Sequence, residues 1–319
     1  MMFATQDDGS RDGRLVIVSK DHERFLPGPV ATLQQLLEEW HSHVDALSGA
    51  AAALDEGAGE KLDIAALLAP LPRSWQWLDG SAFTSHGALM QRAFKMPPIE
   101  SDLPLMYQGL SHTFLSACAD VRLPSEAHGI DFEGEFGVIT DDVPMGVTAE
   151  AAMDHIRLVV QINDWSLRTF AASEMKTGFG WIQAKPACSV APVAVTPDEL
   201  GAAWRKGRVC LPLHVHWNGE DFGRPNGSEM AFGFHELLAH AALTRSLPAG
   251  TIIGSGTVSN DDYATHGSTC VSERRGIEMI EQGAPKTDFL RFGDRIQMEA
   301  VGPDGQPLFG TLDQLVVQA

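Results

Sequence analysis

The sequence predicts a mainly β, α+β protein in which a strand-rich C-terminal body follows a small α/β N-terminal domain. From Asp131 onward, short strand patterns alternate with turn residues. The front of the chain carries one hairpin pattern and one well-capped helix. Prolines at 70, 72, 97, 98 and 104 make 69–105 the expected boundary. We therefore expect an N-terminal domain over 1–80, a linker over 81–104 and the body over 105–319.

The composition is typical of a soluble globular protein with a sizeable core. Of the 319 residues, 44% are hydrophobic and 20% charged, and 23 basic against 42 acidic residues give a net charge of −19. This balance disfavours nucleic acid or an anionic membrane as a partner, because both bind cationic surfaces. No apolar run approaches the ~20 residues that span a bilayer, and the start of the chain lacks the pattern of a signal peptide. The four cysteines are widely spaced, so we expect reduced thiols in a cytoplasmic protein.

Turn and helix-capping residues predict the elements of the N-terminal domain. Residues 1–20 predict a hairpin, because a polar turn precedes the apolar strand pattern 15–18. Thr32 is a good helix N-cap, and Gln35 completes a capping box before apolar residues at helical spacing. We expect this helix to end at Gly49 and the alanine-rich stretch after it to form a weak helix or a linker. His41 and His43 are expected on the helix surface.

The body opens with an acidic strand over residues 130–139. With a period of two, one face carries Phe132, Phe136 and Val138, and the other carries Asp131, Glu133 and Glu135. Side chains at i and i+2 lie roughly 6.5–7 Å apart on one face of a strand. The acidic face is therefore either solvated or gathered around a hard divalent cation, because burying unpaired carboxylates is costly.

Further along, an apolar strand over 158–162 runs into the polar stretch 163–168. Asp164 there is either a helix N-cap or part of a ligand site. Lys185 is either solvated or placed where an oxyanion develops. Helices are expected near 148–156 and 232–246. The pair Asn218-Gly219 after an alternating run predicts a hairpin.

Two apparent motifs fail on geometry. His235 and His240 resemble a zinc-protease helix, but five residues rotate a helix by about 500°, so the two rings point in different directions. Gly254 and Gly256 form a lone Gly-x-Gly with no helix after it, which excludes a dinucleotide loop. The loop is either a simple turn or a source of backbone N–H groups, with the Thr257 hydroxyl, for an anionic or carbonyl ligand.

Taken together, the motifs resemble those of the fumarylacetoacetate hydrolase family in the family's order, over about residues 105–315. The matching segments are Asp131-Phe132-Glu133-Gly134-Glu135, Asn163-Asp164-Trp165-Ser166-Leu167-Arg168, Lys185, Gly250-Thr251-Ile252-Ile253-Gly254-Ser255-Gly256-Thr257 and Phe292-Gly293-Asp294. The first 70–80 residues resemble the small N-terminal domain of two-domain members.

The resemblance implies twisted, rolled β-sheets around the active site and a homodimer. It also implies Mg²⁺, or Mn²⁺ or Ca²⁺, held by the residues that match Glu133, Glu135 and Asp164. Substrates of the family are 1,3-dicarbonyl or 2-oxo acids, and the typical reaction is hydrolysis of a carbon–carbon bond. We therefore expect a hydrolase of the fumarylacetoacetate or acylpyruvate type, acting in the catabolism of aromatic compounds such as aromatic amino acids.

By the same resemblance, Lys185 would stabilise developing negative charge, and Arg168 would help to hold the substrate or the site. Gly256 and Thr257 would bind a carboxylate or carbonyl. Glu273 would orient a catalytic histidine.

The chain departs from the family at one stretch. The hydrolases supply a fourth metal carboxylate and, seven residues later, a histidine that activates water. By register on Phe114 these positions are Thr113 and Asp120, and neither residue type suits the role. His112 is the nearest replacement for the base, or else an exposed loop histidine.

This departure leaves two alternatives to the hydrolase. One is a lyase on the same scaffold, either a 2-oxo acid decarboxylase or a 2-keto-4-pentenoate hydratase, which needs the metal but not the same base. The other is a silent homologue that binds a dicarboxylate without turnover.

Overall fold

The computed structural model describes residues 1–95, 97, 101–302 and 305–319. Among them, eleven strands form one large sheet, with bounds β1 (Met2–Gln6), β2 (Arg14–Val18), β3 (Arg24–Pro27), β4 (Glu60–Lys61), β5 (Trp77–Gly80), β6 (Met106–Gln108), β9 (Gly134–Thr140), β10 (Ile156–Asn163), β12 (Ser189–Val190), β13 (Ala194–Val195) and β18 (Ile252–Gly254). Their order is β4-β3-β2-β1-β13-β10-β9-β18-β5-β6, and β12 pairs with β10 beside this path.

A second sheet within the described residues has five strands in the order β17-β16-β19-β20-β7. Its bounds are β7 (Val121–Leu123), β16 (Leu213–Trp217), β17 (Glu220–Gly223), β19 (Arg295–Ala300) and β20 (Leu312–Gln318). Two short ladders complete the strands: β8 (Ile130–Asp131) with β11 (Ser166–Leu167), and β14 (Trp204–Arg205) with β15 (Arg208–Val209). The predicted hairpin is confirmed, because Asn218 and Gly219 both take positive φ between β16 and β17.

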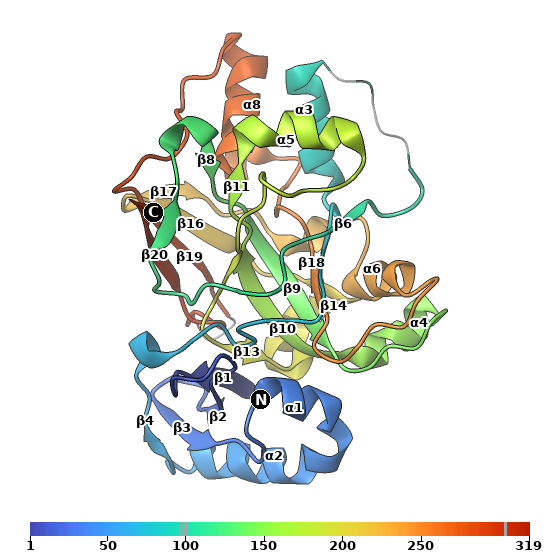
Figure 1. The fold of residues 1–319 in the computed structure, drawn as a ribbon, viewed down its shortest axis with the longest axis vertical. Coiled ribbons are helices and arrows are strands. Elements are labelled where there is room, and N and C mark those ends of the chain that lie inside the picture. Colours follow the sequence, from blue (N-terminus) through green and yellow to red (C-terminus); the bar gives the residue numbers. More distant parts are fainter. Residues whose placement is uncertain (96, 98–100, 303–304) are drawn as a thin grey trace.

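The helices lie around these sheets (Figure 1). The α-helices are α1 (Leu33–Glu38), α2 (Trp40–Asp55), α3 (Thr84–Phe94), α4 (Ala149–Ala152), α5 (Arg168–Thr177), α6 (Phe234–Ala241), α7 (Tyr263–His266) and α8 (Val271–Gln282). The 3-10 turns are η1 (Ile64–Ala66), η2 (Glu126–His128), η3 (Met153–His155), η4 (Pro197–Ala203) and η5 (Gly227–Glu229). The expected fold class, mainly β and α+β with a small N-terminal domain, is confirmed.

The N-terminal domain holds β1–β4, α1 and α2. Thr32 caps α1 as predicted, because its hydroxyl accepts a hydrogen bond from the Gln35 amide at 3.1 Å. The expected helix end at Gly49 is wrong. The chain breaks instead at Glu39, and α2 then continues through Gly49 to Asp55, since the alanines after Gly49 favour helix.

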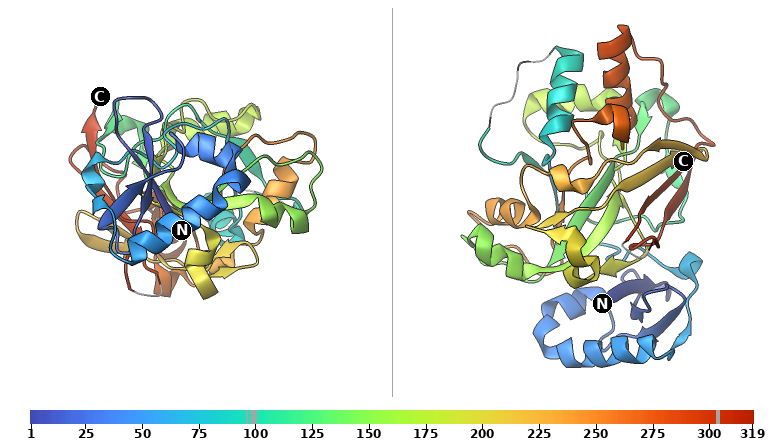
Figure 2. Two further views of the ribbon diagram at one scale, coloured as in Figure 1. Left: turned by 90° about the horizontal axis from the view of Figure 1, so that it is seen from below. Right: turned by 180° about the vertical axis from the view of Figure 1, so that it is seen from behind.

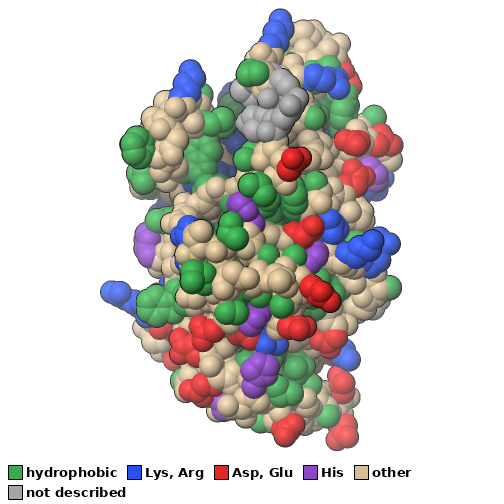
Figure 3. Space-filling model, turned by 90° about the vertical axis from the view of Figure 1, so that its right-hand side faces the viewer, with side chains coloured by type: hydrophobic (Ala, Val, Ile, Leu, Met, Phe, Trp, Pro, Cys, Tyr) green, Lys and Arg blue, Asp and Glu red, His purple; other side chains and the backbone are tan. Residues whose placement is uncertain are grey.

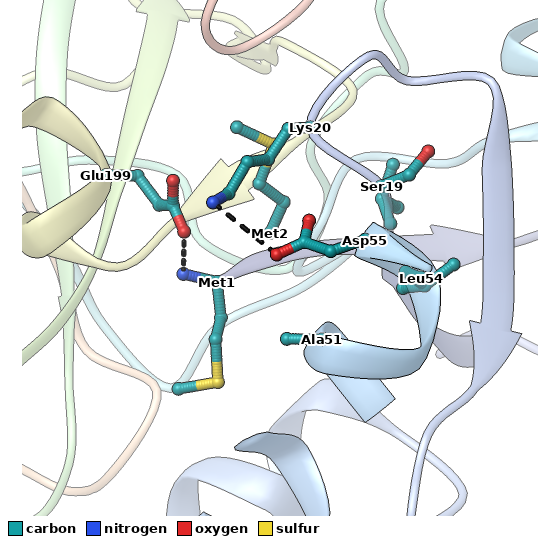
Figure 4. A pocket seen from close by; sticks show the side chains of 9 residues that line it. Met1, Met2, Ser19, Lys20, Ala51, Leu54, Asp55 and Glu199 are labelled. Atoms are coloured by element: carbon teal, nitrogen blue, oxygen red, sulfur yellow. Dashed lines mark hydrogen bonds and ion pairs between the residues drawn. The ribbon is translucent and has the colours of Figure 1, made fainter. Parts of the chain in front are cut away.

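Two contacts tie this domain to the body. Strand β1 pairs with β13 of the body, which joins the strands of both parts into one sheet. Beside it, the Met1 ammonium lies 2.6 Å from Glu199 Oε1 at a small pocket that Lys20 and Asp55 also line (Figure 4).

A polar cluster, here the Asp141 cluster, makes a third contact between the two parts. Asp141 accepts hydrogen bonds from His155 Nδ1 and Arg157 Nε, both at 2.7 Å. Arg157 Nη2 lies 3.1 Å from His41 Nε2 on α2. The side chain of His41 is 79% exposed, as its place on the helix predicted.

The stretch 81–104, expected to be a linker, instead contains α3. This helix packs against α8 at the end of the molecule opposite the N-terminal domain (Figures 1 and 2). Residues 96 and 98–100 of that stretch lie outside the described residues. Strand β5, which was assigned to the N-terminal domain, pairs with β18 and β6 of the body. The body therefore begins before residue 80.

The surface carries mixed charge. On the face drawn in Figure 3, Lys and Arg side chains are scattered among acidic ones. Within the described residues, none of the helices combines the length and apolar character needed to span a membrane.

Candidate active site

Strand pairing brings three acidic residues together. Glu135 lies on β9, and Asp164 follows β10, which pairs antiparallel with β9. Strand β18 lies between β9 and β5, with Gly254 directly opposite Asp79. A Cβ at Gly254 would lie 2.4 Å from Oδ1 of Asp79, so only glycine leaves room for this carboxyl group.

These three residues form the carboxylate cluster. One oxygen each from Asp79, Glu135 and Asp164 lies within 4.8 Å of the others, and the residues are 5%, 0% and 0% exposed. Neither oxygen of Glu135 accepts a hydrogen bond from an N–H or hydroxyl group of the described residues. Burial and the neighbouring carboxylates raise the pKa of Asp79 to about 8 and hold the pKa of Glu135 above its usual range. The cluster thus needs either a shared proton or a cation.

Lys185 supplies one positive charge at the edge of the cluster. Its Nζ lies 2.5 Å from Asp164 Oδ2 and 2.5 Å from Glu133 Oε2. Burial opposes the charge of Lys185, but Asp164 and Glu133 outweigh it and raise its pKa. The solvated alternative for Lys185 is therefore excluded, and the ammonium joins Glu133 to the cluster.

Arg168 holds the other acidic residues of the strand. Its Nε donates to Asp131 at 2.8 Å and its Nη2 to Glu133 Oε1 at 2.5 Å. Although burial raises the pKa of Glu133, Arg168 and Lys185 outweigh it, and the pKa falls to about 2. Asp131 also accepts the amides of Val271 and Ser272 at the start of α8. The acidic face of the predicted strand is therefore buried and largely paired.

Asp164 is positioned by two further donors. Tyr107 OH donates to Oδ2 at 2.6 Å, and the Cys188 thiol donates to Oδ1 at 2.9 Å. Burial and the nearby Asp164 carboxylate raise the pKa values of both Tyr107 and Cys188. Both groups therefore stay protonated and donate to Asp164 near neutral pH.

The cluster fits a hard divalent cation. All of its donors are carboxylate oxygens, the ligands that Mg²⁺, Mn²⁺ and Ca²⁺ prefer. Glu135 offers two buried oxygens that no hydrogen-bond donor among the described residues satisfies. A cation between Glu135, Asp79 and Asp164 would relieve the repulsion that burial imposes.

A histidine–glutamate pair lies next to this region. His86 on α3 places Nδ1 3.6 Å from Oε1 of Glu273 on α8. Glu273 is buried, and Ser259 donates to the same oxygen at 2.5 Å. Backbone pairing of Glu133 with Cys270, three residues before Glu273, connects the pair to the carboxylate region. His86 also lies close enough to help lower the pKa of Glu133.

The structure brings together most of the residues that the sequence singled out. Glu135 and Asp164 share the carboxylate cluster, and Glu133 is joined to it through Lys185. Glu273 faces His86. Arg168 lies beside Glu133. The catalytic and ligand roles of these residues remain proposals.

The loop residues differ from expectation. The amide of Gly256 donates to Asp79 Oδ1 at 2.9 Å, so it supports the cluster rather than an open ligand position. Thr257, next to it, is buried. His112 is exposed in the loop after β6, and no hydrogen bond or ion pair among the described residues ties it to the cluster.

Asp79 and His86 were not among the residues predicted from the sequence. They are seven residues apart, the spacing expected for the fourth carboxylate and the histidine, yet this pair was sought at Thr113 and Asp120. That register is wrong, because Asp120 is exposed and Asp79 is the residue that lies beside Glu135. The spacing Asp79-x₆-His86 was the available signal, hidden by assigning residues 1–104 to another domain and a linker.

The fold has two main sheets, and its site combines a carboxylate cluster with a histidine–glutamate pair. Both features are those expected of the metal-dependent enzyme family that the sequence motifs resemble. Residues 76–317 match the family model described as fumarylacetoacetate (FAA) hydrolase C-terminal, and residues 1–73 match fumarylacetoacetase N-terminal domain 2. The chain belongs to the fumarylacetoacetate hydrolase family.

Curated relatives carry several activities. The 2,4-didehydro-3-deoxy-L-rhamnonate hydrolase of Sphingomonas sp. (strain SKA58) is 27% identical over 170 residues, 50% of this chain and 56% of the relative. The fumarylacetoacetase of Caenorhabditis elegans is 26% identical over 241 residues, 62% and 58% of the two chains. The mitochondrial oxaloacetate tautomerase fahd2 of Xenopus laevis is 24% identical over 157 residues, 48% and 47%. The chain thus matches roughly half the length of each.

Solved structures agree over the whole fold. Maleylpyruvate hydrolase from Sphingobium sp. SYK-6, in complex with manganese(II) ion and pyruvate, has a TM-score of 0.67 at 17% identity, with 100% of both chains covered. The 5-carboxymethyl-2-hydroxymuconate delta-isomerase from Mycobacterium smegmatis has a TM-score of 0.63 at 17% identity, covering 100% of this chain and 99% of that one. At these identities the likeness shows the fold.

Proposed function

We propose that this chain is a metal-dependent hydrolase that cleaves a carbon–carbon bond in a 1,3-dicarbonyl or 2-oxo acid of the fumarylacetoacetate or acylpyruvate type. The observation that carries the proposal is the His86–Glu273 pair beside an all-oxygen carboxylate cluster. Such a pair is what water activation needs and what the expected Thr113 and Asp120 could not supply. The manganese and pyruvate bound to one solved relative support a cation and a 2-oxo acid as ligands.

Glu135 and Asp164, with Asp79, are the proposed ligands of Mg²⁺, or of Mn²⁺ or Ca²⁺. Glu133, which the resemblance also implied as a ligand, is instead engaged by Lys185 and Arg168. When bound, the cation supplies a Lewis acid for the adjacent oxygens of the substrate. Lys185 adds a fixed positive charge beside those oxygens, which favours the negative charge that develops as the carbon–carbon bond breaks. Arg168 keeps Glu133 ionised and in place. By the resemblance, the Thr257 hydroxyl is proposed to donate to the substrate carboxylate.

His86 is the proposed general base. His86 Nδ1 faces the Glu273 carboxylate at 3.6 Å, so Nε2 is the ring nitrogen proposed to accept a proton from water. Glu273 then stabilises the imidazolium that forms, and Ser259 fixes the orientation of Glu273. This division of roles resembles that in other histidine–carboxylate pairs, where the carboxylate selects the tautomer.

A second candidate is an isomerase or tautomerase, because relatives with those names match this chain about as well as the hydrolases do. His86 could move a proton between carbon positions in the same place. The lyase alternatives, a decarboxylase and a hydratase, also remain open on this scaffold. The alternative of a homologue that binds a dicarboxylate without turnover rested on the absence of a fourth carboxylate and a histidine. Asp79 and His86 are candidates for these two residues, which weakens that alternative.

The test is turnover of acylpyruvates and fumarylacetoacetate, followed by ultraviolet loss of the enol and by product identification. Protein stripped with chelator should be inactive, and Mg²⁺ or Mn²⁺ should restore activity. Two acids as products identify the hydrolase. Carbon dioxide with a ketone, a hydroxylated acid, or an isomer of unchanged composition would identify the decarboxylase, hydratase or isomerase instead. Metal binding without turnover of any substrate would favour the silent homologue.

His86→Ala should lower kcat by about 10²–10⁴-fold, because it removes the base but no ligand of the carboxylate cluster. His112→Ala is the matched comparison, since His112 is the other histidine proposed for this role. If His112→Ala abolished turnover and His86→Ala did not, the assignment of the base to His86 would be overturned.

We also propose that the chain acts as a homodimer in the cytoplasm. Phe179 and Ile182, in the segment after α5, are 97% and 85% exposed, and Met175 on α5 is also exposed. Large apolar side chains that are exposed within one short segment are typical of an interface. Light scattering should give twice the chain mass, and Phe179→Ser with Ile182→Ser should shift it toward the monomer. No disulfide forms among the described cysteines, which suits a reducing compartment.

A further inference from the structure

A second cluster of possible ligands lies beside the carboxylate cluster and differs from it in chemistry. His86 Nδ1, Cys270 Sγ and a carboxylate oxygen of Glu273 all lie within 4.8 Å of one another. His86 comes from α3, Cys270 is the N-cap of α8, and Glu273 lies in the first turn of α8. Nitrogen, sulfur and oxygen ligands together suit Zn²⁺, whereas Mg²⁺ and Ca²⁺ prefer oxygen alone.

Two atoms of this cluster lack hydrogen-bond partners. Neither His86 Nδ1 nor Glu273 Oε2 has one among the described residues, although Glu273 is only 1% exposed. The distance of 3.6 Å from His86 Nδ1 to Glu273 Oε1 is too long for a direct hydrogen bond. It is close to the roughly 3.4 Å between two ligand atoms around a tetrahedral zinc ion with bonds of about 2.05 Å. The unpaired atoms therefore point to a ligand held between the two side chains.

We propose that His86, Cys270 and Glu273 form a second metal site, selective for Zn²⁺ or a similar thiophilic divalent ion, and that its occupation inhibits the enzyme. The inhibitory part rests on the proposed function, because it follows from withdrawing His86 and Glu273 from proton transfer. The binding part rests on the three side chains alone. Three protein ligands leave a fourth tetrahedral position for water or a substrate oxygen.

The two sites are neighbours but compete little for ligands. The backbone of Glu133 pairs with that of Cys270, while the Glu133 side chain is engaged by Lys185 and Arg168. Mg²⁺ in the carboxylate cluster therefore takes none of the three side chains of the Cys270 site. Burial raises the pKa of Cys270, so the ion has to displace the thiol proton as it binds.

The test uses Co²⁺ as a spectroscopic substitute for Zn²⁺, added to the full chain in excess Mg²⁺. Wild-type protein should develop the near-ultraviolet charge-transfer band of a cobalt–thiolate bond at one Co²⁺ per chain, and Zn²⁺ should remove it. Cys270→Ser should lack the band, and serine should preserve the helix cap. Cys188→Ala, which removes the thiol beside Asp164, is the matched control and should keep the band. No band in the wild type, or a band lost with Cys188 and kept without Cys270, would overturn the site.

A second variant tests the site independently if Cys270→Ser fails to fold. His86→Ala should weaken Co²⁺ binding by at least about tenfold while the thiolate band can still form at high cobalt. Unchanged Co²⁺ affinity in a folded His86→Ala protein would also overturn the site.

Inhibition is tested separately, as the Zn²⁺ dependence of Mg²⁺-supported turnover, with each variant compared to its own rate without zinc. Zn²⁺ should inhibit the wild type and lose potency by about tenfold or more in Cys270→Ser. A cobalt–thiolate band at Cys270 with no inhibition by Zn²⁺ would leave the metal site standing and would contradict the role of His86 in turnover.

Discussion

Two carboxylates of one acidic stretch, Glu133 and Glu135, are both buried but lie in opposite electrostatic surroundings. Glu133 accepts hydrogen bonds from Lys185 and Arg168, and its pKa is about 2. Glu135 accepts none from an N–H or hydroxyl group of the described residues, and burial with Asp79 and Asp164 raises its pKa. The protein therefore compensates one end of the stretch with its own cations and leaves the other end uncompensated.

This difference in surroundings indicates that Glu133 supports the structure, whereas Glu135 is suited to bind a cation. A carboxylate that already has two cationic partners contributes to stability, whereas a buried carboxylate with none costs stability unless something else binds. The Asp141 cluster, where Arg157 and His155 surround the acid, belongs to the first type. Asp79 and Glu135 belong to the second, and that is the physical argument for a bound cation.

The largest expected effect is on the pH dependence of stability without metal. The pKa of Asp79 rises from its ordinary value of 3.8 to about 8 on folding. The folded state thus holds a proton that the unfolded state has lost between these values, so stability should fall as pH rises from about 4 to about 8 and then level off. We expect a decrease of a few kcal/mol in chelator, measured by urea unfolding. Asp79→Asn should flatten the curve, and an equally steep curve in that variant would contradict the assignment.

Substitution at the compensated end should destabilise the protein. Glu133→Gln leaves Lys185 and Arg168 with one fewer acidic partner each, at a cost of about 3 kcal/mol. In the same chelated buffer, Glu135→Gln should be neutral or stabilising, because it removes a charge that has no cationic partner. The free energy of unfolding of the two variants at neutral pH checks the contrast. Equal destabilisation by both substitutions would contradict the claim that Glu133 has cationic partners and Glu135 has none.

Substitution at the uncompensated end should instead weaken metal binding. Glu135→Ala removes one of the carboxylate ligands, so affinity for Mg²⁺ or Mn²⁺ should fall by about an order of magnitude or more. Calorimetry measures this directly. Glu220→Ala, an exposed acidic residue on β17, is the control and should bind as the wild type does. Unchanged affinity in Glu135→Ala would mean that the ion binds elsewhere.

The smallest effects should come from the Asp141 cluster. Asp141→Asn weakens the contacts with Arg157 and His155 and should cost about 1 kcal/mol of stability without changing metal affinity. His41→Ala, at the exposed edge of the same cluster, should change stability by less than about 0.5 kcal/mol. Thermal unfolding and calorimetry of both variants test this. A large loss of metal affinity in Asp141→Asn would contradict the division of roles.

Local features of the fold were predictable because their causes are local. The Thr32 cap and the Asn218-Gly219 hairpin depend on residues within a few positions of each other, and both are confirmed. The end of the helix near Gly49 was not, because a glycine inside a helix costs only about 1 kcal/mol and its neighbours outweighed it.

Only part of the site was predictable, because some of its residues are brought together by pairing of strands that are distant in the sequence. Glu133, Glu135 and Asp164 stand out by spacing and by their place beside strands. Asp79 joins them only through the parallel pairing of β5 with β18, and its hydrogen bond to Gly256 spans 177 residues. Phe114, the anchor of the wrong register, packs edge-on against Trp77 of β5, two residues before Asp79. Phe114 therefore lies near the correct site in space, although it is far from Asp79 in the sequence.

The most direct test of the central claim is the position of Mn²⁺ in crystals of the full chain, found from its anomalous scattering. We predict a peak within bonding distance of Glu135, Asp79 and Asp164, with Lys185 at its edge, and no peak there in crystals of Glu135→Ala. A peak at another place, or none at saturating Mn²⁺, would contradict the claim that this uncompensated carboxylate cluster is the metal site.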